Sequence, residues 1–75
     1  MTKVANNILS SHAYVVKNAY VRELPNSRAK PVMYATTGTN LDILGAFADE
    51  HGAYYHVCCE EGKTGWVRRS ACEVI

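Results

Sequence analysis

Histidine and cysteine carry the most reactive side chains of this chain. His56 and Cys58 stand two positions apart, so on a β-strand both would lie on one face, where an imidazole can activate a thiol. A nucleophile also needs a pocket and donors for the charge that develops on its substrate, and no neighbouring motif supplies them. We therefore expect no catalytic residues and a protein that is not an enzyme.

A metal site would have to draw on His51, His56 and the three cysteines, Cys58, Cys59 and Cys72. Their spacing lacks the Cys-x₂₋₄-Cys pair typical of zinc sites. Adjacent cysteines on a strand also point to opposite faces, so they chelate one ion poorly. The sequence predicts no metal site and no other cofactor. It favours three free thiols, with a bond from Cys72 to one of the adjacent pair as the alternative.

Aromatic side chains offer a different chemistry, the recognition of a ligand in a shallow groove. A tyrosine ring with its polar tip suits such a groove. The aromatic set comprises Tyr14, Tyr20, Tyr34, Tyr54, Tyr55 and Trp66. Tyr54 and Tyr55 must alternate, one facing inward and one outward. We expect Trp66 foremost as a core or half-core residue, with groove lining as the alternative. We expect Tyr20, Tyr55 and Tyr34 to be the exposed rings. The candidate ligand site is Tyr20, Arg22, Glu23, Tyr34, Tyr55 and Trp66.

The elements that position these residues read as short strands. Stretches rich in β-branched and aromatic residues at 13–17, 20–22, 32–35, 41–43, 54–59, 66–68 and 73–75 alternate with Gly, Pro and Asn turn signals. Gly45 is expected to interrupt the strand at 41–43, and one 3₁₀ turn is expected at 70–72. Residues 1–12 are expected to form a flexible or short helical arm. We predict an all-β domain over 13–75, a small barrel of five to six strands.

The order of these signals resembles the bacterial SH3 (SH3b) family. Tyr20-Val21-Arg22 with Pro25 resembles its Asn-Val-Arg element and loop, although Tyr20 replaces the Asn. Gly38-Thr39 and the strand up to Gly45 follow, and Tyr54-Tyr55-His56-Val57 replaces a strand that opens with Trp. The run Gly62-Lys63-Thr64-Gly65-Trp66-Val67 matches the family letter for letter. In this run Gly62 and Gly65 can take a positive φ without steric cost.

This resemblance implies an SH3-like barrel and a noncatalytic binding module. Its partner would be bacterial cell-wall peptidoglycan or its peptides, as for the targeting domain of a lytic or surface protein. The alternative is a small intracellular or phage-encoded protein that binds or assembles with other proteins. Glu60-Glu61 and Arg68-Arg69 are interpreted as solvated turn and rim charges.

Composition narrows the partners further. The chain has 75 residues, enough for one small domain, and a net charge of +1. Without a clustered basic face, neither nucleic acid nor an anionic membrane surface is expected as a partner. No apolar run approaches the roughly 20 residues of a membrane span. Residues 1–12 lack the apolar core of a secretory signal, so we expect a protein that stays inside the cell or virion, leaves by lysis, or belongs to a longer chain.

Overall fold

The computed structural model describes residues 11–75, and they form an all-β domain, as the sequence predicts. The seven strands are β1 (His12–Val15), β2 (Ala19–Arg22), β3 (Pro31–Ala35), β4 (Asn40–Asp49), β5 (Gly52–Cys58), β6 (Thr64–Arg68) and β7 (Cys72–Val74), with a 3₁₀ turn η1 (Arg69–Ala71) before β7. The sequence predicts five or six strands, one or two fewer. Of the expected N-terminal arm, residues 1–10 lie outside the described part, and His12 already belongs to β1.

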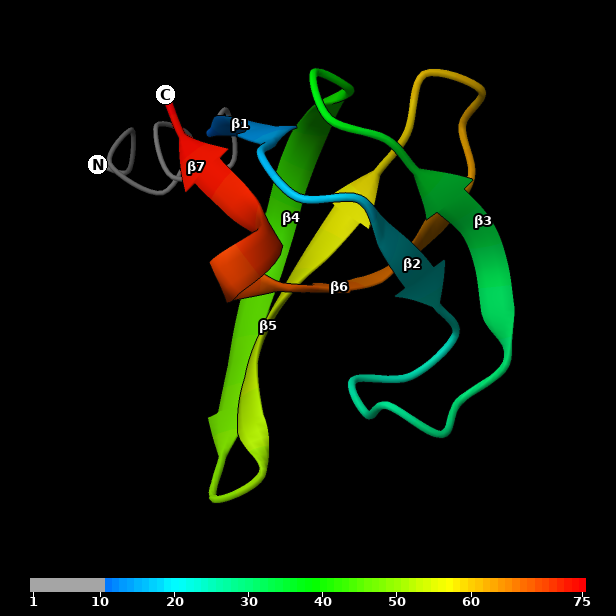
Figure 1. Cartoon of the computed structure of the whole chain (residues 1–75), viewed down its shortest axis with the longest axis vertical. Helices are drawn as coiled ribbons and strands as arrows, with labels where there is room; N and C mark the ends of the chain where they lie inside the picture. The colour runs from blue at the N-terminus through cyan, green and yellow to red at the C-terminus, as the bar shows by residue number, and fades with distance from the viewer. Residues whose placement is uncertain (1–10) are drawn as a thin grey trace, which may run out of the picture.

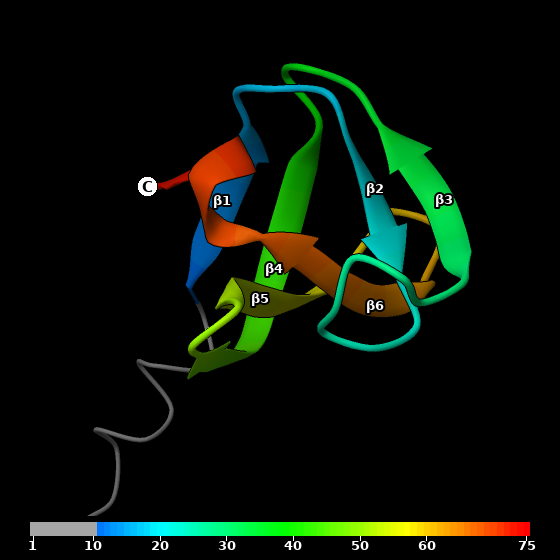
Figure 2. The same ribbon diagram turned by 60° about the horizontal axis from the view of Figure 1, so that its bottom comes forward.

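The strands form one antiparallel sheet in the order β3-β2-β6-β5-β4-β1-β7. The sheet curls into a half-barrel, with β2 and β3 on one side and β1 and β7 on the other (Figures 1 and 2). Strands β2 and β6 share a single register pair, Arg22 opposite Trp66. The two halves of the sheet therefore meet at a short junction.

Strand β4 is longer than the sequence predicts. Gly45 does not end it: the strand continues to Asp49, and its register against β5 shifts between Ile43 and Gly45. A bulge of this kind adds a residue and bends the strand without breaking the pairing. As a result the β4–β5 hairpin projects well beyond the barrel (Figure 1).

The core lies inside the curl and is built by alternation along the strands. Its buried members are Val15, Val21, Ala35, Leu41, Val57, Cys59, Val67 and Ala71. Trp66 is not among them: it is half-buried and lies between Gly65 and Val67, the two buried residues of β6. Trp66 is thus half in the core at most: its strand position turns it to the face opposite the core cluster, so it does not fill the barrel.

Gly62 and Gly65 serve different purposes. Gly62 has a φ of 86°, the positive value predicted for it, whereas Gly65 is not among the glycines with positive φ. A Cβ on Gly65 would lie 2.6 Å from Val21 Cγ1 and 2.8 Å from the Arg22 carbonyl oxygen. Gly65 is thus required by the close approach of β6 to β2, and not by its backbone angle.

Candidate ligand-binding cleft

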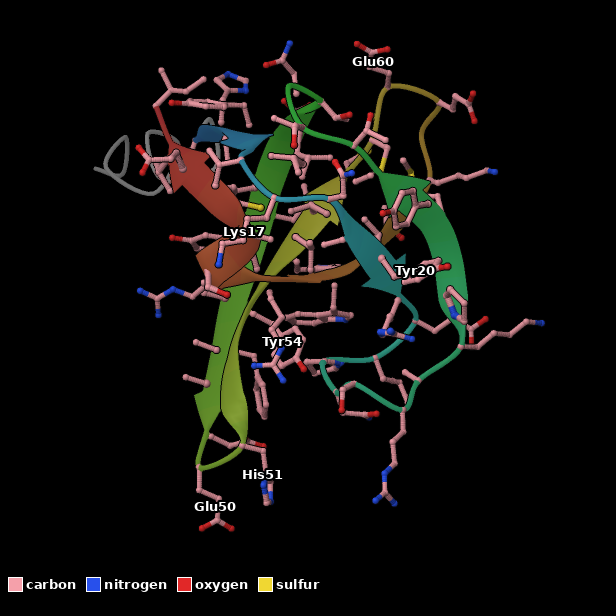
Figure 3. The ribbon with its side chains drawn as sticks, in the orientation of Figure 1. Lys17, Tyr20, Glu50, His51, Tyr54 and Glu60 are labelled. Carbon is pink, nitrogen blue, oxygen red and sulfur yellow. The ribbon has the colours of Figure 1, made fainter. Side chains whose placement is uncertain are left out.

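A cleft of about 460 Å³ separates the β2–β3 loop (residues 23–30) from the β4–β5 hairpin. We call it the loop–hairpin cleft. Its lining residues are Pro25, Asn26, Ser27 and Arg28 of the loop, Asp49 and His51 of the hairpin, Tyr54 of β5 and Arg68 of β6. His51 lies near the tip of the hairpin and Tyr54 nearer the barrel (Figure 3). The cleft exists because the bulged β4 carries the hairpin out opposite the loop.

The loop wall is shaped by hydrogen bonds within the loop and to its base. Arg22 Nη1 donates to the Ala29 carbonyl oxygen at 2.9 Å. At the base of the loop, the Glu23 amide donates to the carbonyl oxygen of Lys30 at 2.9 Å. Near the tip, Asn26 Oδ1 accepts from the Arg28 amide at 2.9 Å. An Asn that binds a backbone amide two residues on fixes a local turn, so this wall has a defined shape.

The hairpin wall is fixed by Asp49. Its Oδ1 accepts hydrogen bonds from the amides of His51 at 2.9 Å and Gly52 at 3.1 Å. This is the side-chain-to-backbone bonding by which Asp favours turns. One oxygen of the only carboxylate that lines the cleft is therefore engaged by the turn itself.

The floor of the cleft is the ring of Tyr54, which the guanidinium of Arg68 covers. Tyr54 is only 4% exposed, and the Arg68 guanidinium carbon lies 5.2 Å from the centre of its ring. This geometry is a cation–π contact. A Cβ on Gly52 would come within 2.8 Å of Arg68 Nη1, so the absence of a side chain there lets the guanidinium lie against the hairpin backbone.

Further aromatic groups continue from this floor on the same face of the sheet. His56 and Trp66 are opposite each other in the register of β5 and β6, and their rings stack at 4.5 Å with 17° between planes. Phe47 meets Trp66 edge-on at 6.3 Å. Because Tyr54 and Arg68 are each two residues from this pair along their strands, all four side chains share one face. Trp66, the only tryptophan, therefore lies close to the cleft.

The structure brings part of the predicted site together. Tyr20 and Tyr34 are register partners whose rings lie 4.8 Å apart, and the Arg22 guanidinium lies 5.2 Å from the Tyr20 ring. Both tyrosines are about half exposed, at 48% and 50%. Glu23 follows at the exposed base of the loop. This cluster lies outside the set of residues that lines the cleft.

Tyr55 lies apart from the other predicted residues. It pairs with Val67, packs against the core, and carries the Arg69 guanidinium 5.4 Å from its ring centre. Alternation places it on the face opposite Tyr54, so the outward orientation expected for Tyr55 is wrong. The sequence reasoning also missed Arg28, Asp49, His51 and Arg68 as members of one cleft. The available signal was the polar turn at 49–52, which is separated from the tyrosine pair by Ala53 alone.

A second cleft, of about 480 Å³, lies near the opposite end of β5, between β1 and the β5–β6 turn. Its lining is His12, Asn40, Leu41, Asp42, Cys58, Cys59, Glu60, Gly62 and Ile75. His12 Nδ1 and Asp42 Oδ1 are 2.8 Å apart there, with both side chains 62% exposed. Water screens such an exposed pair strongly, and among residues 11–75 no tyrosine, tryptophan or phenylalanine lines this cleft. It is the poorer groove for an organic ligand.

The cysteines of residues 11–75 form no disulfide. Cys58, Cys59 and Cys72 are free thiols, and burial raises the pKa of both Cys59 and Cys72, which keeps these two protonated and unreactive. Within residues 11–75, no three His, Cys, Asp or Glu side chains are grouped so as to hold a metal ion. In the same part of the chain, no helix has the length and apolar character needed to cross a membrane.

Comparison of the chain with protein-family models, with curated proteins and with solved structures found no match.

Proposed function

We propose that this chain is a noncatalytic binding module with an SH3-like barrel, and that its loop–hairpin cleft takes an extended peptide of the bacterial cell wall. The observation that carries the proposal is the cleft itself. It joins a buried tyrosine floor to polar and charged walls held by their own hydrogen bonds. Grooves that bind extended peptides combine an aromatic surface with a few polar groups that fix orientation.

The topology supports the SH3-like part of this proposal. A long loop between β2 and β3 folds beside the β4–β5 hairpin, and the 3₁₀ turn η1 precedes the last strand. These features accompany the motifs in which the sequence resembles the bacterial SH3 family, including the run from Gly62 to Val67. Peptidoglycan peptides are the ligand class that the resemblance implies.

Sedimentation of the protein with insoluble cell walls tests the proposal. We expect the wild-type chain to sediment with the walls and Ser27→Phe to stay in solution, because an exposed serine in the cleft wall would be replaced by a ring that fills the cleft. Ser70→Phe is the matched control, since Ser70 is also an exposed serine but lies in η1, outside the cleft. Wild-type protein that sediments with no bacterial wall, or Ser27→Phe that sediments as well as Ser70→Phe, would overturn the proposal.

A second candidate function is assembly with another protein or a second copy. It is favoured by the exposed pair of Tyr20 on β2 and Tyr34 on β3. Strand β3 is an edge strand, since its one neighbour in the described sheet is β2. Exposed sheet edges pair readily with other chains, and an added lysine discourages this. Light scattering should then show a defined oligomer that Tyr34→Lys dissociates. A monomer at all concentrations would rule this candidate out.

A further inference from the structure

Arg68 is a guanidinium held in place without an acidic partner. It lies across the Tyr54 ring at 5.2 Å and against Gly52, where a Cβ would meet its Nη1 at 2.8 Å. Within residues 11–75, neither a hydrogen bond nor a carboxylate within 4.0 Å engages its charged end. Arg68 is exposed and lines the cleft, so its planar, paired donors are open to a ligand there.

The cleft lining holds two guanidinium groups and one carboxylate. Arg28 brings a second guanidinium from the opposite wall, and His51 adds an imidazole. Asp49 is the single carboxylate of the lining, and one of its oxygens holds the hairpin turn. Glu50 is the acidic residue next to Asp49 in the sequence. Its Oε2 lies 3.7 Å from His51 Nε2, and Glu50 is not part of the cleft lining. Two guanidinium groups therefore stand against one carboxylate whose Oδ1 is already engaged.

We propose that the loop–hairpin cleft selects peptides that carry a free carboxylate, and that Arg68 receives this carboxylate. The inference rests on the proposed function and deepens it, because it names the group that the cleft recognises. A guanidinium meets a carboxylate with two parallel N–H···O hydrogen bonds, which a lysine ammonium does not reproduce. The contact with Tyr54 orients Arg68 before the ligand arrives, which reduces the side-chain freedom lost on binding.

The neighbouring residue supplies a matched control. Arg69 also lies over a tyrosine, with 5.4 Å from its guanidinium carbon to the ring centre of Tyr55, and it is also exposed. It lies outside the cleft lining. Arg68→Lys and Arg69→Lys therefore make the same chemical change at adjacent positions, one inside the cleft and one outside.

The test is a titration with two forms of the wall stem peptide L-Ala-γ-D-Glu-L-Lys-D-Ala, one with free carboxyl groups and one with every carboxyl group amidated. Trp66 fluorescence and calorimetry report binding, since Trp66 stands two residues before Arg68 on the same face. We expect the free-acid form to bind at least about tenfold more tightly than the amidated form, the size typical of a hydrogen bond to a charged group. Arg68→Lys should remove most of that preference, whereas Arg69→Lys should keep it.

The outcomes separate this inference from the proposed function. If both forms bind the wild-type protein equally, carboxylate selection is wrong while peptide binding stands. If the wild-type protein prefers the free acid and Arg68→Lys keeps that preference, Arg68 is not the group that receives the carboxylate, and this part of the inference is wrong. If neither form binds and walls do not sediment the protein, both proposals fail. If neither form binds although walls do, carboxylate selection also fails, because the cleft then recognises another group of the wall. Circular dichroism of the two lysine variants checks that both are folded.

Discussion

Two arginine–tyrosine pairs, Arg68 with Tyr54 and Arg69 with Tyr55, are neighbours in sequence and have different surroundings. Arg68 covers Tyr54 in the loop–hairpin cleft, where Tyr54 is 4% exposed. Arg69 covers Tyr55, which is half-buried against the core on the other face of the sheet. The comparison teaches that residue type does not decide which pair lines the cleft. Strand alternation decides it, together with the register that places Tyr54 opposite Arg68.

The adjacent cysteines repeat this difference at the other end of β5. Cys59 is buried in the core cluster and Cys58 is half-buried, although both line the second cleft. At each end of β5, two identical neighbours thus differ in how deeply they are buried. Substituting one member and then the other measures what each environment contributes.

The largest expected difference is between the two tyrosines. Tyr54→Ala should lower the free energy of unfolding by about 3–5 kcal/mol, the usual cost of truncating a buried aromatic residue. Tyr55→Ala should cost less, because part of the Tyr55 ring already contacts water in the native protein. Urea unfolding monitored by circular dichroism measures both.

Tyr54→Phe and Tyr55→Phe are the controls for this prediction. Each keeps the ring and removes a hydroxyl group that makes no hydrogen bond within the described residues, so each should change the free energy of unfolding little. A larger loss in Tyr55→Ala than in Tyr54→Ala would show that the core side of the hairpin, and not the cleft floor, contains the tyrosine on which stability depends.

The second prediction concerns Gly65, the residue of β6 that lies closest against β2. Gly65→Ala should destabilise the fold by about 1–3 kcal/mol, as overpacking usually does, because its Cβ would overlap Val21 and the Arg22 carbonyl group. Gly45→Ala is the matched control: its Cβ would meet only His56 Cβ, at an ordinary 3.9 Å. Equal stability of the two variants would contradict the close approach of β6 to β2.

The fold could largely be predicted from the sequence because strand alternation and turn signals act locally. All seven strands fall within or beside the stretches identified from β-branched and aromatic residues, and the 3₁₀ turn lies one residue from its expected place. The exception is β4, where Gly45 signals a break. The chain instead makes a bulge, because pairing with β5 continues beyond it.

The cleft could be predicted from the sequence much less well than the fold, since its walls come from segments more than twenty positions apart. Arg28 and His51 share it only because the bulged hairpin extends opposite the β2–β3 loop. Sequence identifies Tyr54 and Tyr55 as residues on opposite faces but does not say which face meets the cleft. That choice depends on the pairing of β5 with β6, a long-range property. Tyr20 and Tyr34 were correctly expected to be exposed, yet they lie outside the cleft lining.

The smallest expected effect is a difference between the two adjacent cysteines in how the stability of the fold depends on pH. Burial, the main cause, raises the pKa of the Cys59 thiol above its usual value of 9.0, with smaller contributions from nearby charges. Between pH 9.0 and the raised pKa, the folded chain keeps a proton that the unfolded chain releases, so the free energy of unfolding must fall as the pH rises. The stability associated with the neutral thiol is complete below pH 9.0 and is lost above it. Urea unfolding at several pH values should therefore show a shallower alkaline decline in Cys59→Ala than in Cys58→Ala. Equal slopes would mean that the environment of Cys59 does not disfavour its thiolate.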